Sequence, residues 1–141
     1  MTTTKRVAVV QGLFAETPNG PRLLGSKCAT CGTPYFPKSP VCHNPDCQNP
    51  RVEDAQFGPR GTLWSYVVQY YPPPPPVKYD QPFVPYAVGA VDLPEGLRVL
   101  GRMSVDDVKK IKIGMDVDLV VERLCGDQDG NEVTTWKFRL A

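Results

Sequence analysis

Two closely spaced pairs of cysteines constrain this chain more than any other feature of its sequence. Cys28 and Cys31 are spaced C-x-x-C, and Cys42 and Cys47 follow as C-x-x-x-x-C after ten intervening residues. Tetrahedral zinc prefers soft thiolate ligands, which many proteins supply as two such pairs. Gly32 follows the first pair directly and tolerates the positive φ that a metal knuckle often needs. The four cysteines therefore predict a zinc ribbon.

The other uses of four sulfurs fit less well. No apolar run approaches the roughly 18 residues that span a bilayer, and the N-terminus lacks a signal-peptide pattern, so we expect a cytoplasmic protein. A reducing cytosol disfavours structural disulfides. A thioredoxin-like C-x-x-C would begin a helix, which Pro34, Pro37 and Pro40 oppose. Iron in a rubredoxin-like setting uses similar knuckles and stays open as an alternative to zinc.

The metal is expected to be structural. Four protein ligands leave no coordination position for water or substrate. His43 lies beside Cys42 and could substitute as a ligand, although four cysteines already close the shell. Structural zinc is worth about 10–16 kcal/mol in small finger peptides, which is enough to order a segment without a core of its own.

The composition is that of a soluble globular protein. The 141 residues, 41% hydrophobic and 22% charged, suffice for one domain, or for a small domain with a mini-domain attached. The formal net charge is +1, and four thiolates on a divalent ion add −4 and +2, which takes it to about −1. Such a chain has no strong attraction to nucleic acid or to an anionic membrane.

The part of the chain after residue 60 is expected to form a small β-barrel. Its segments are rich in aromatic and β-branched residues, and a short helical turn over 104–114, with Ser104 as N-cap, separates the third from the fourth. This element order is that of a five-stranded OB-fold. The predicted strands are 62–71, 84–93, 97–103, 115–124 and 133–140.

The first 57 residues are expected to form a separate unit. Asn19-Gly20 predicts a hairpin that leads into the ribbon. The polar stretch 51–62, interrupted by Gly58, Pro59 and Gly61, indicates a boundary. We therefore expect a mainly β protein, with a hairpin and zinc ribbon over 1–57 and the OB-fold over 58–141.

A stiff connection is expected between the first two barrel strands. Pro72–Pro76 are five consecutive prolines, which form a polyproline II rod that projects from the barrel. The rod is either a ligand for a groove on a partner or a rigid loop that orders its neighbours, and the sequence leaves both readings open.

The residues offer no catalytic site. A nucleophile needs a base within reach, and Cys125, the only thiol outside the two pairs, is expected to be a small buried residue at the end of a strand. The acidic stretch 127–132 lacks calcium-loop spacing and is expected to be a hairpin turn at Asp129-Gly130. Aromatic residues of the barrel could stack bases, but the chain has no basic surplus for nucleic-acid binding.

Several segments, in this order, resemble a known family. They are "RLLGSKCATCGTPYFPKSPVC" with the following Cys47, "GPRGTLWSYVVQYYPPPP", "VPYAVGAVDLPEGLRVLGRM" and "KIKIGMDVDLVVERL". Together they resemble the zinc-ribbon plus OB-fold proteins formerly described only as a domain of unknown function. The resemblance runs from about residue 22 to the C-terminus, and in its light Cys28, Cys31, Cys42 and Cys47 match the family's zinc positions.

The resemblance implies a function. Members of that family accompany thiolase-like acyl-CoA enzymes, so the chain would be a zinc-binding, non-catalytic accessory subunit of a hetero-oligomeric thiolase-type complex. A coenzyme A thioester, of an aromatic acid for example, would be the substrate of the complex, cleaved thiolytically or by a retro-Claisen or aldol reaction. The residues expected to face the partner or substrate are Trp64, Tyr70, Tyr71, Pro74, Tyr79 and Phe83.

Two features depart from the family pattern. The second knuckle has four intervening residues where two are common, and the N-terminus reads as a hairpin where many members begin with an amphipathic helix. Two other functions stay open as alternatives. The chain could be a ribbon and OB module that binds single-stranded nucleic acid, or a stand-alone acyl-CoA-binding protein.

Overall fold

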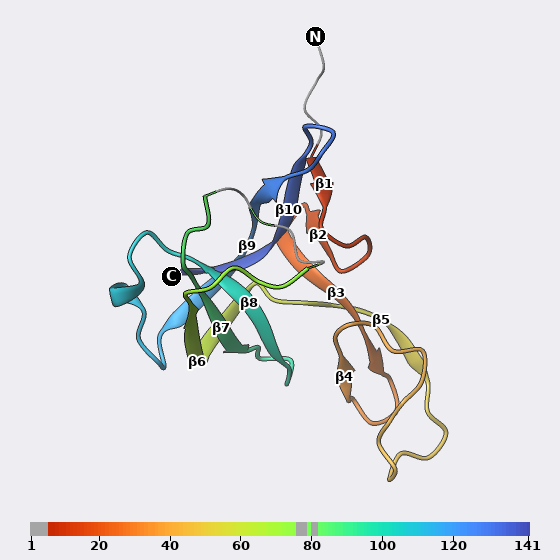
Figure 1. Cartoon of the computed structure of the whole chain (residues 1–141). Helices are drawn as coiled ribbons and strands as arrows, with labels where there is room; N and C mark the ends of the chain where they lie inside the picture. The colour runs from red at the N-terminus through yellow and green to blue at the C-terminus, as the bar shows by residue number, and fades with distance from the viewer. Residues whose placement is uncertain (1–5, 76–78, 80–81) are drawn as a thin grey trace.

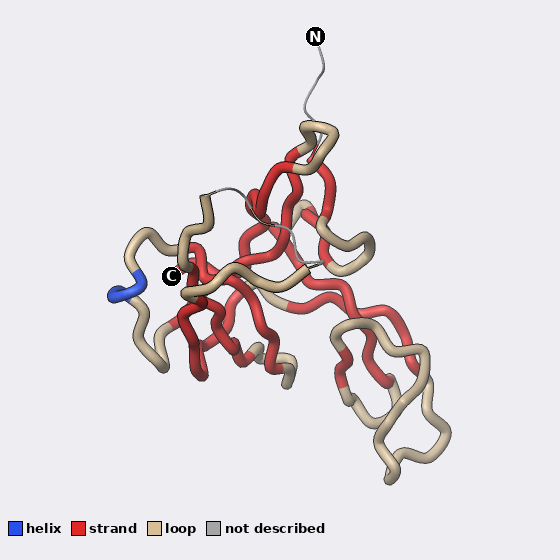
Figure 2. The backbone as a smooth tube through the Cα atoms, in the orientation of Figure 1, coloured by secondary structure: helices blue, strands red, loops and turns tan. Residues whose placement is uncertain are grey.

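The computed structural model describes residues 6–75, 79 and 82–141, and these residues form two β-sheets (Figures 1 and 2). The cysteine pairs lie at one end of the smaller sheet and in its loops, and the larger sheet closes into a barrel. The smaller sheet consists of β2 (Phe14–Thr17), β3 (Gly20–Cys28), β4 (Pro34–Tyr35) and β5 (Val52–Phe57). The larger consists of β1 (Arg6–Ala8), β6 (Arg60–Gln69), β7 (Tyr86–Asp92), β8 (Arg98–Ser104), β9 (Asp116–Gly126) and β10 (Glu132–Leu140).

Five strands of the larger sheet form the predicted OB-fold barrel. The order is β10-β8-β7-β6-β9, and a further pairing of β9 with β10 closes the ring. All neighbours in the ring are antiparallel except β8 and β10, which pair in parallel over Arg102–Ser104 and Lys137–Arg139. The 3₁₀ turn η1 (Val108–Lys110) lies between β8 and β9. The expected mainly β fold, a ribbon followed by a five-stranded barrel, is confirmed.

Apolar residues that alternate along the barrel strands fill its interior, as half-buried strands require. Leu63, Val91, Val117 and Phe138 are fully buried at its centre. Leu23 of β3 and Phe57 of β5 belong to the same core. The paired ends of β3 and β5 at Leu23 and Phe57 are therefore packed into the barrel core. From there the same two strands continue to the first cysteine pair.

Three local expectations need correction. The polar stretch 51–62, expected to mark a boundary, contains the strand β5, which pairs with β3 from Leu23↔Phe57 to Cys28↔Val52. Val52, Ala55 and Phe57 within it are at least partly buried. Asp107, not Ser104, caps the helical turn, and its side chain accepts a hydrogen bond from the Lys109 N–H. The third concerns β1, which pairs in parallel with β10 of the barrel although Arg6–Ala8 lie within the stretch expected to form the hairpin and ribbon.

The hairpin at Asn19-Gly20 is confirmed, because β2 and β3 pair antiparallel across it and Gly20 has a φ of +102°. The cysteine-bearing end of β3, with β4 and the neighbouring loops, projects from the barrel at the lower right of Figure 1. The tip of the polyproline connection lies outside the described residues. Within the part of the chain that is described, no helix is long and apolar enough to cross a membrane. The division at residues 57 and 58 stays a prediction.

Candidate metal centre

The backbone brings the two cysteine pairs together from two segments. Cys28 ends β3 and Cys31 lies in the turn that follows, whereas Cys42 and Cys47 lie in the loop between β4 and β5. The Gly32 N–H donates to the Cys28 carbonyl at 2.7 Å, and Gly32 has a φ of +81°. The positive φ expected at this glycine is therefore confirmed.

The distances between the sulfurs fit tetrahedral zinc. The Sγ atoms of Cys28 and Cys47 are 3.7 Å apart, as are those of Cys31 and Cys42. All four Sγ atoms lie within 4.8 Å of one another. A tetrahedron with zinc–sulfur bonds of about 2.3 Å has edges of about 3.8 Å. A disulfide needs sulfurs about 2.05 Å apart, so the arrangement is that of metal ligands and not of bridges.

The protein favours thiolate at the first knuckle. The Cys31 backbone N–H, with those of Arg51 and Thr30, lowers the pKa of Cys28 to about 6 against the effect of burial. The Thr33 hydroxyl and backbone lower the pKa of Cys31. Burial, with the neighbouring cysteine thiols, raises the pKa of Cys47 to about 12. A divalent cation at the centre of the four sulfurs is the group that would stabilise all of them as thiolates.

Tyr35 supports the second knuckle, although the sequence reasoning gave it no role. Its hydroxyl donates to the Cys42 Sγ at 3.5 Å and accepts from the His43 N–H at 2.7 Å. The His43 ring packs edge-on against Tyr35 and its Nε2 lies 3.0 Å from the Ser39 Oγ. Among the described residues the metal-binding cluster consists of the four cysteines. His43 thus contributes through its backbone and ring contacts.

The chemistry of this donor set is structural. Four sulfurs complete the shell of a tetrahedral ion, so substrate and water have no position on it. The four cysteines could be recognised from the sequence because their spacing is local. Tyr35 was missed because an aromatic residue on a two-residue strand carries no recognisable pattern.

The other predicted residues fall into two groups. Tyr79 and Phe83 line a hollow on the barrel together with Tyr86, and the Phe83 ring centroid lies 5.8 Å from that of Tyr79 and 6.0 Å from that of Tyr86. The remaining four are exposed on the surface outside this hollow. They are Trp64, Tyr70, Tyr71 and Pro74. Whether they face a partner or a substrate stays a prediction.

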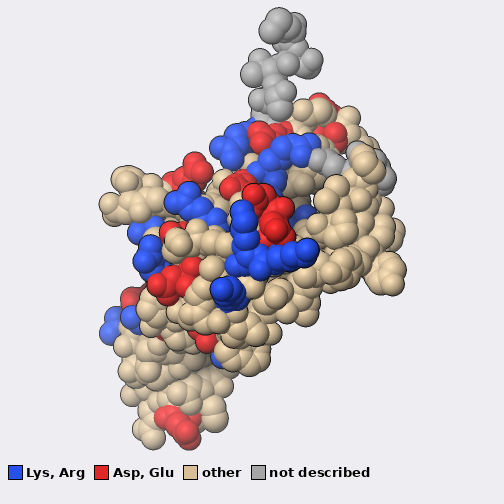
Figure 3. All heavy atoms as spheres, turned by 90° about the vertical axis from the view of Figure 1, so that its left-hand side faces the viewer, with Lys and Arg blue, Asp and Glu red and all other residues tan. Residues whose placement is uncertain are grey.

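The remaining candidates have structural roles. Cys125 is fully buried at the end of β9, as expected. The 127–132 stretch is a hairpin turn in which the Asp127 carboxylate accepts from the N–H groups of Asp129 and Asn131. On the face in Figure 3, basic and acidic side chains are intermixed, and no continuous basic surface runs across it.

Comparison with known proteins agrees with this architecture. Residues 21–53 match the family described as "ChsH2, rubredoxin-like zinc ribbon domain", and residues 54–122 match "ChsH2, C-terminal OB-fold domain". A DUF35 domain-containing scaffold protein of Methanocaldococcus jannaschii is 30% identical over 119 residues, which cover 83% of this chain and 80% of that protein.

Two further likenesses concern enzyme subunits. The benzoylsuccinyl-CoA thiolase subunit BbsA of Thauera aromatica is 29% identical over 84% of this chain and 76% of its own. The solved structure described as "Ltp2-ChsH2(DUF35) aldolase" contains a chain with 31% identity and a TM-score of 0.62, and the match covers 84% of both chains.

A four-cysteine zinc ribbon followed by a closed OB-fold barrel defines the class of this protein. Within that class the sequence match extends over most of the chain. The chain belongs to the DUF35 family, with a zinc ribbon and an OB-fold domain of the ChsH2 type.

Proposed function

We propose that this chain is a zinc-binding accessory subunit of a thiolase-type enzyme that acts on an acyl-CoA. It stabilises the catalytic subunit and shapes its substrate cavity, while the catalytic residues lie on the partner. The reaction of the complex is a thiolytic, retro-Claisen or aldol cleavage of a carbon–carbon bond.

The observation that carries the proposal is the likeness to enzyme subunits along most of the chain. It covers 84% of this chain both for BbsA, a thiolase subunit, and for the ChsH2(DUF35) aldolase structure. The likeness includes both the ribbon and the barrel. A shared role as a companion of an acyl-CoA enzyme is therefore supported more strongly than a role in nucleic-acid binding.

The geometry agrees with a non-catalytic role. The closed sulfur shell gives the metal no open position, and Cys125 is buried away from solvent. Exposed aromatic side chains offer contact area, because Trp64, Tyr70 and Tyr71 are 53%, 65% and 77% exposed. Aromatic residues are enriched in protein interfaces, where they bury large areas.

The chemistry of such a complex places the demanding step on the partner. In the thiolytic case, a cysteine thiolate of the partner would attack the β-keto carbon of the acyl-CoA. The bond between the α and β carbons would then break, which leaves the acyl group on the cysteine as a thioester and releases acetyl-CoA or another acyl-CoA after protonation of its α-carbon. The role of this chain is to hold and enclose the partner's site. In the absence of a bound metal its ribbon would lose order, and the partner would lose that support.

Native mass spectrometry of the tagged protein, purified gently from its own host, tests the proposal. We expect a thiolase-like chain to co-purify, with one zinc ion per accessory chain. Cys28→Ser combined with Cys31→Ser should abolish both zinc and partner, whereas the control Cys125→Ala should keep them. An active complex formed by the double variant would refute the proposal, as would recovery of the chain alone.

A further inference from the structure

The barrel surface carries a hollow that a positively charged side chain helps to line. One part is a cavity of about 190 Å³ lined by Phe83, Tyr86, Arg102 and Leu124 among others. An adjoining part of about 280 Å³ shares Tyr86, Arg102 and Leu124 and is also lined by Leu100 and Trp136. We call the two parts together the Arg102 groove. Its defining residues are Phe83, Tyr86, Leu100, Arg102, Leu124 and Trp136.

The groove lies where OB-folds hold ligands. Such barrels bind them on the face of the second and third strands, beside the loop that joins the first strand to the second. Here these strands are β7, which carries Tyr86, and β8, which carries Leu100 and Arg102. Phe83 belongs to the connection between β6 and β7. The groove is therefore built from the elements that form ligand sites in other OB-folds.

Trp136 closes one side of the groove. Strands β8 and β10 pair over only three residues of each strand, and before this pairing they diverge. The Trp136 indole N–H bridges the gap and donates to the Leu100 carbonyl at 3.0 Å. The indole is thus held in place and its N–H is a sensitive reporter of the groove.

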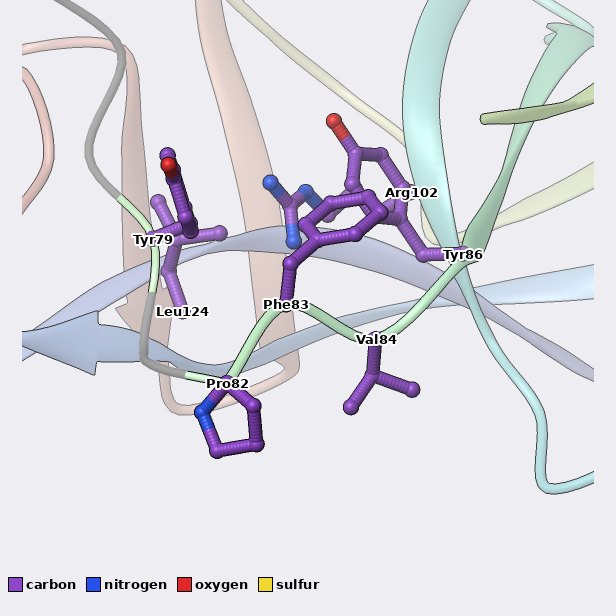
Figure 4. A pocket seen from close by; sticks show the side chains of 7 residues that line it. All are labelled: Tyr79, Pro82, Phe83, Val84, Tyr86, Arg102 and Leu124. Atoms are coloured by element: carbon purple, nitrogen blue, oxygen red, sulfur yellow. The ribbon is translucent and has the colours of Figure 1, made fainter. Parts of the chain in front are cut away.

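Arg102 presents donors to the hollow. Its guanidinium carbon lies 3.7 Å from the Tyr86 ring centroid, and the side chain is half-buried. In Figure 4 the rings of Phe83 and Tyr86 lie to one side of its guanidinium end, and the side chain of Leu124 lies to the other. Stacking uses the face of the guanidinium, whereas its N–H donors lie in the plane and stay available for a carboxylate or phosphate.

Arg102 has a basic neighbour and forms no ion pair of its own within the described residues. Lys137 is its register partner on β10, and the Lys137 Nζ lies 3.9 Å from the Glu122 Oε1. Burial lowers the pKa of Lys137; Glu122 raises it, and Arg102 and Arg123 lower it further. Within the described ranges 6–75, 79 and 82–141, no Asp or Glu forms an ion pair with Arg102. Arg102 thus lies beside the Lys137 side chain and lines an aromatic hollow.

We propose that the Arg102 groove is a binding site for a small molecule that joins a flat ring to an anionic group, with Arg102 as the receptor for the anion. The aromatic and aliphatic walls would hold the ring, and the guanidinium edge would bind the anion with two parallel N–H···O bonds. An aryl carboxylate and an adenine nucleotide share this chemistry.

The size of the cavity favours the aryl carboxylate. An enclosed cavity of about 150 Å³ is enough for a benzene ring. The part next to Phe83, at about 190 Å³, therefore suits one ring with a small charged substituent. An adenosine bisphosphate would have to extend across both parts and out of the groove.

Binding to the groove depends on residues of this chain alone. That the ligand is an acyl group of the partner's substrate, one that keeps a free carboxylate besides its thioester, rests on the proposed function. The experiment therefore uses the zinc-loaded full chain without a partner. A negative result then concerns ligand binding to the groove and not the formation of a complex.

Titration of the ¹⁵N-labelled protein with benzoate tests the site, because the chain has two tryptophan indole signals. The Trp136 indole lines the groove and should shift saturably. The Trp64 indole lies outside the lining residues and should stay unchanged. Benzamide, the uncharged analogue, should produce no comparable shift. Adenosine 3′,5′-bisphosphate is titrated in parallel to test whether the groove binds an adenine nucleotide and not an aryl carboxylate.

Two variants separate the anion receptor from general effects. Arg102→Gln should weaken benzoate binding about tenfold or more, because it removes a charge-assisted contact. Arg98→Gln is the matched control: Arg98 also lies 3.7 Å from an aromatic ring centroid, that of Trp64, but outside the groove. This control should bind benzoate as the unmodified chain does. The amide spectra show whether each variant is folded.

Each outcome is decisive. Saturable binding of benzoate that depends on Arg102 establishes the site and its aryl carboxylate ligand. Tighter, Arg102-dependent binding of the bisphosphate overturns the argument from cavity size and identifies a nucleotide. Absence of saturable binding by both anions, or equal binding by Arg102→Gln, overturns the site.

Discussion

At the scale of single residues, Tyr35 and Arg98 each hold neighbouring groups in place: Tyr35 does so at the metal centre and Arg98 on the barrel surface. Tyr35 joins the Cys42 sulfur to the backbone of His43, and Arg98 covers Trp64 while it pairs with Asp92 at 2.6 Å. The four clustered cysteines could be recognised from the sequence, but neither of these pairings could. Cysteine spacing is a local pattern, whereas both pairings depend on the folded backbone.

Loss of the Tyr35 hydroxyl should weaken metal binding. Groups that hydrogen-bond to metal ligands typically contribute about 10–100-fold in metal affinity, so we expect Tyr35→Phe to bind zinc less tightly by a factor in that range. Competition with a chromophoric chelator measures this affinity. Tyr71→Phe, at an exposed position, is the control and should bind zinc normally. Equal affinities for the two variants would contradict the role given to Tyr35.

The Asp92–Arg98 pair should make stability depend on pH in one direction. Hydrogen bonds from Arg98 hold the pKa of Asp92 below its ordinary value. A carboxyl group with a lowered pKa contributes stability above its unfolded pKa of about 3.9 and loses it as pH falls through its folded pKa. Asp92→Asn should therefore lower Tm at pH 7, and the difference should shrink in acid.

Thermal unfolding followed by circular dichroism between pH 7 and pH 2 measures this dependence. Asp129→Asn, in the turn between β9 and β10, is the control and should leave Tm unchanged at each pH. A Tm difference for Asp92→Asn that persists undiminished in acid would exclude the ion pair as its cause.

At the scale of elements, most of the barrel strands could be predicted because alternating apolar residues identify half-buried strands. β5 was missed because Glu53, Asp54 and Gln56 are exposed, so the polar sequence indicated a boundary and not a strand. Its pairing with β3 becomes visible only in three dimensions. The Arg102 groove was missed for a related reason. Among its lining residues only the aromatic residues Tyr79, Phe83 and Tyr86 were considered, and the others come from separate strands.

Gly101 on β8 should be intolerant of any side chain. A Cβ there would lie 2.7 Å from the Phe138 Cε2 and 3.0 Å from the Trp136 Nε1. We expect Gly101→Ala to reduce the free energy of unfolding by about 1–3 kcal/mol, because a packed core must shift to admit the methyl group. Gly126→Ala is the control, since its Cβ would approach nothing closer than 3.5 Å. Urea unfolding measures both, and equal midpoints would contradict the close packing at Gly101.

At the scale of the whole molecule, the ribbon and the barrel depend on different stabilising interactions. Buried core residues come from the barrel and from the proximal ends of β3 and β5. Between residues 29 and 51, Phe36 alone packs against this core, and it does so from a partly buried position. The sequence predicted a ribbon followed by a barrel, but not that Phe36 and Phe14 contact Trp136, with ring centroids 5.6 Å and 6.0 Å away.

Removal of zinc should disorder the ribbon and spare the barrel. We expect amide signals of residues 28–51 to collapse toward random-coil positions in the zinc-free protein, because this segment has almost no core of its own. Signals of β6–β10 should keep their dispersion. Readdition of zinc is the control and should restore the spectrum. Loss of the barrel signals together with those of the ribbon would show that the metal stabilises the entire fold.

The pairing of β3 with β5 has a consequence for how the molecule moves in solution. Six successive residue pairs lead from Leu23↔Phe57, in the barrel core, to Cys28↔Val52, at the first metal knuckle. A two-stranded ladder of this kind resists bending far more than a single connecting segment. The zinc-loaded protein should therefore reorient as one elongated body, so that nitrogen relaxation rates in ribbon and barrel obey a single anisotropic diffusion tensor.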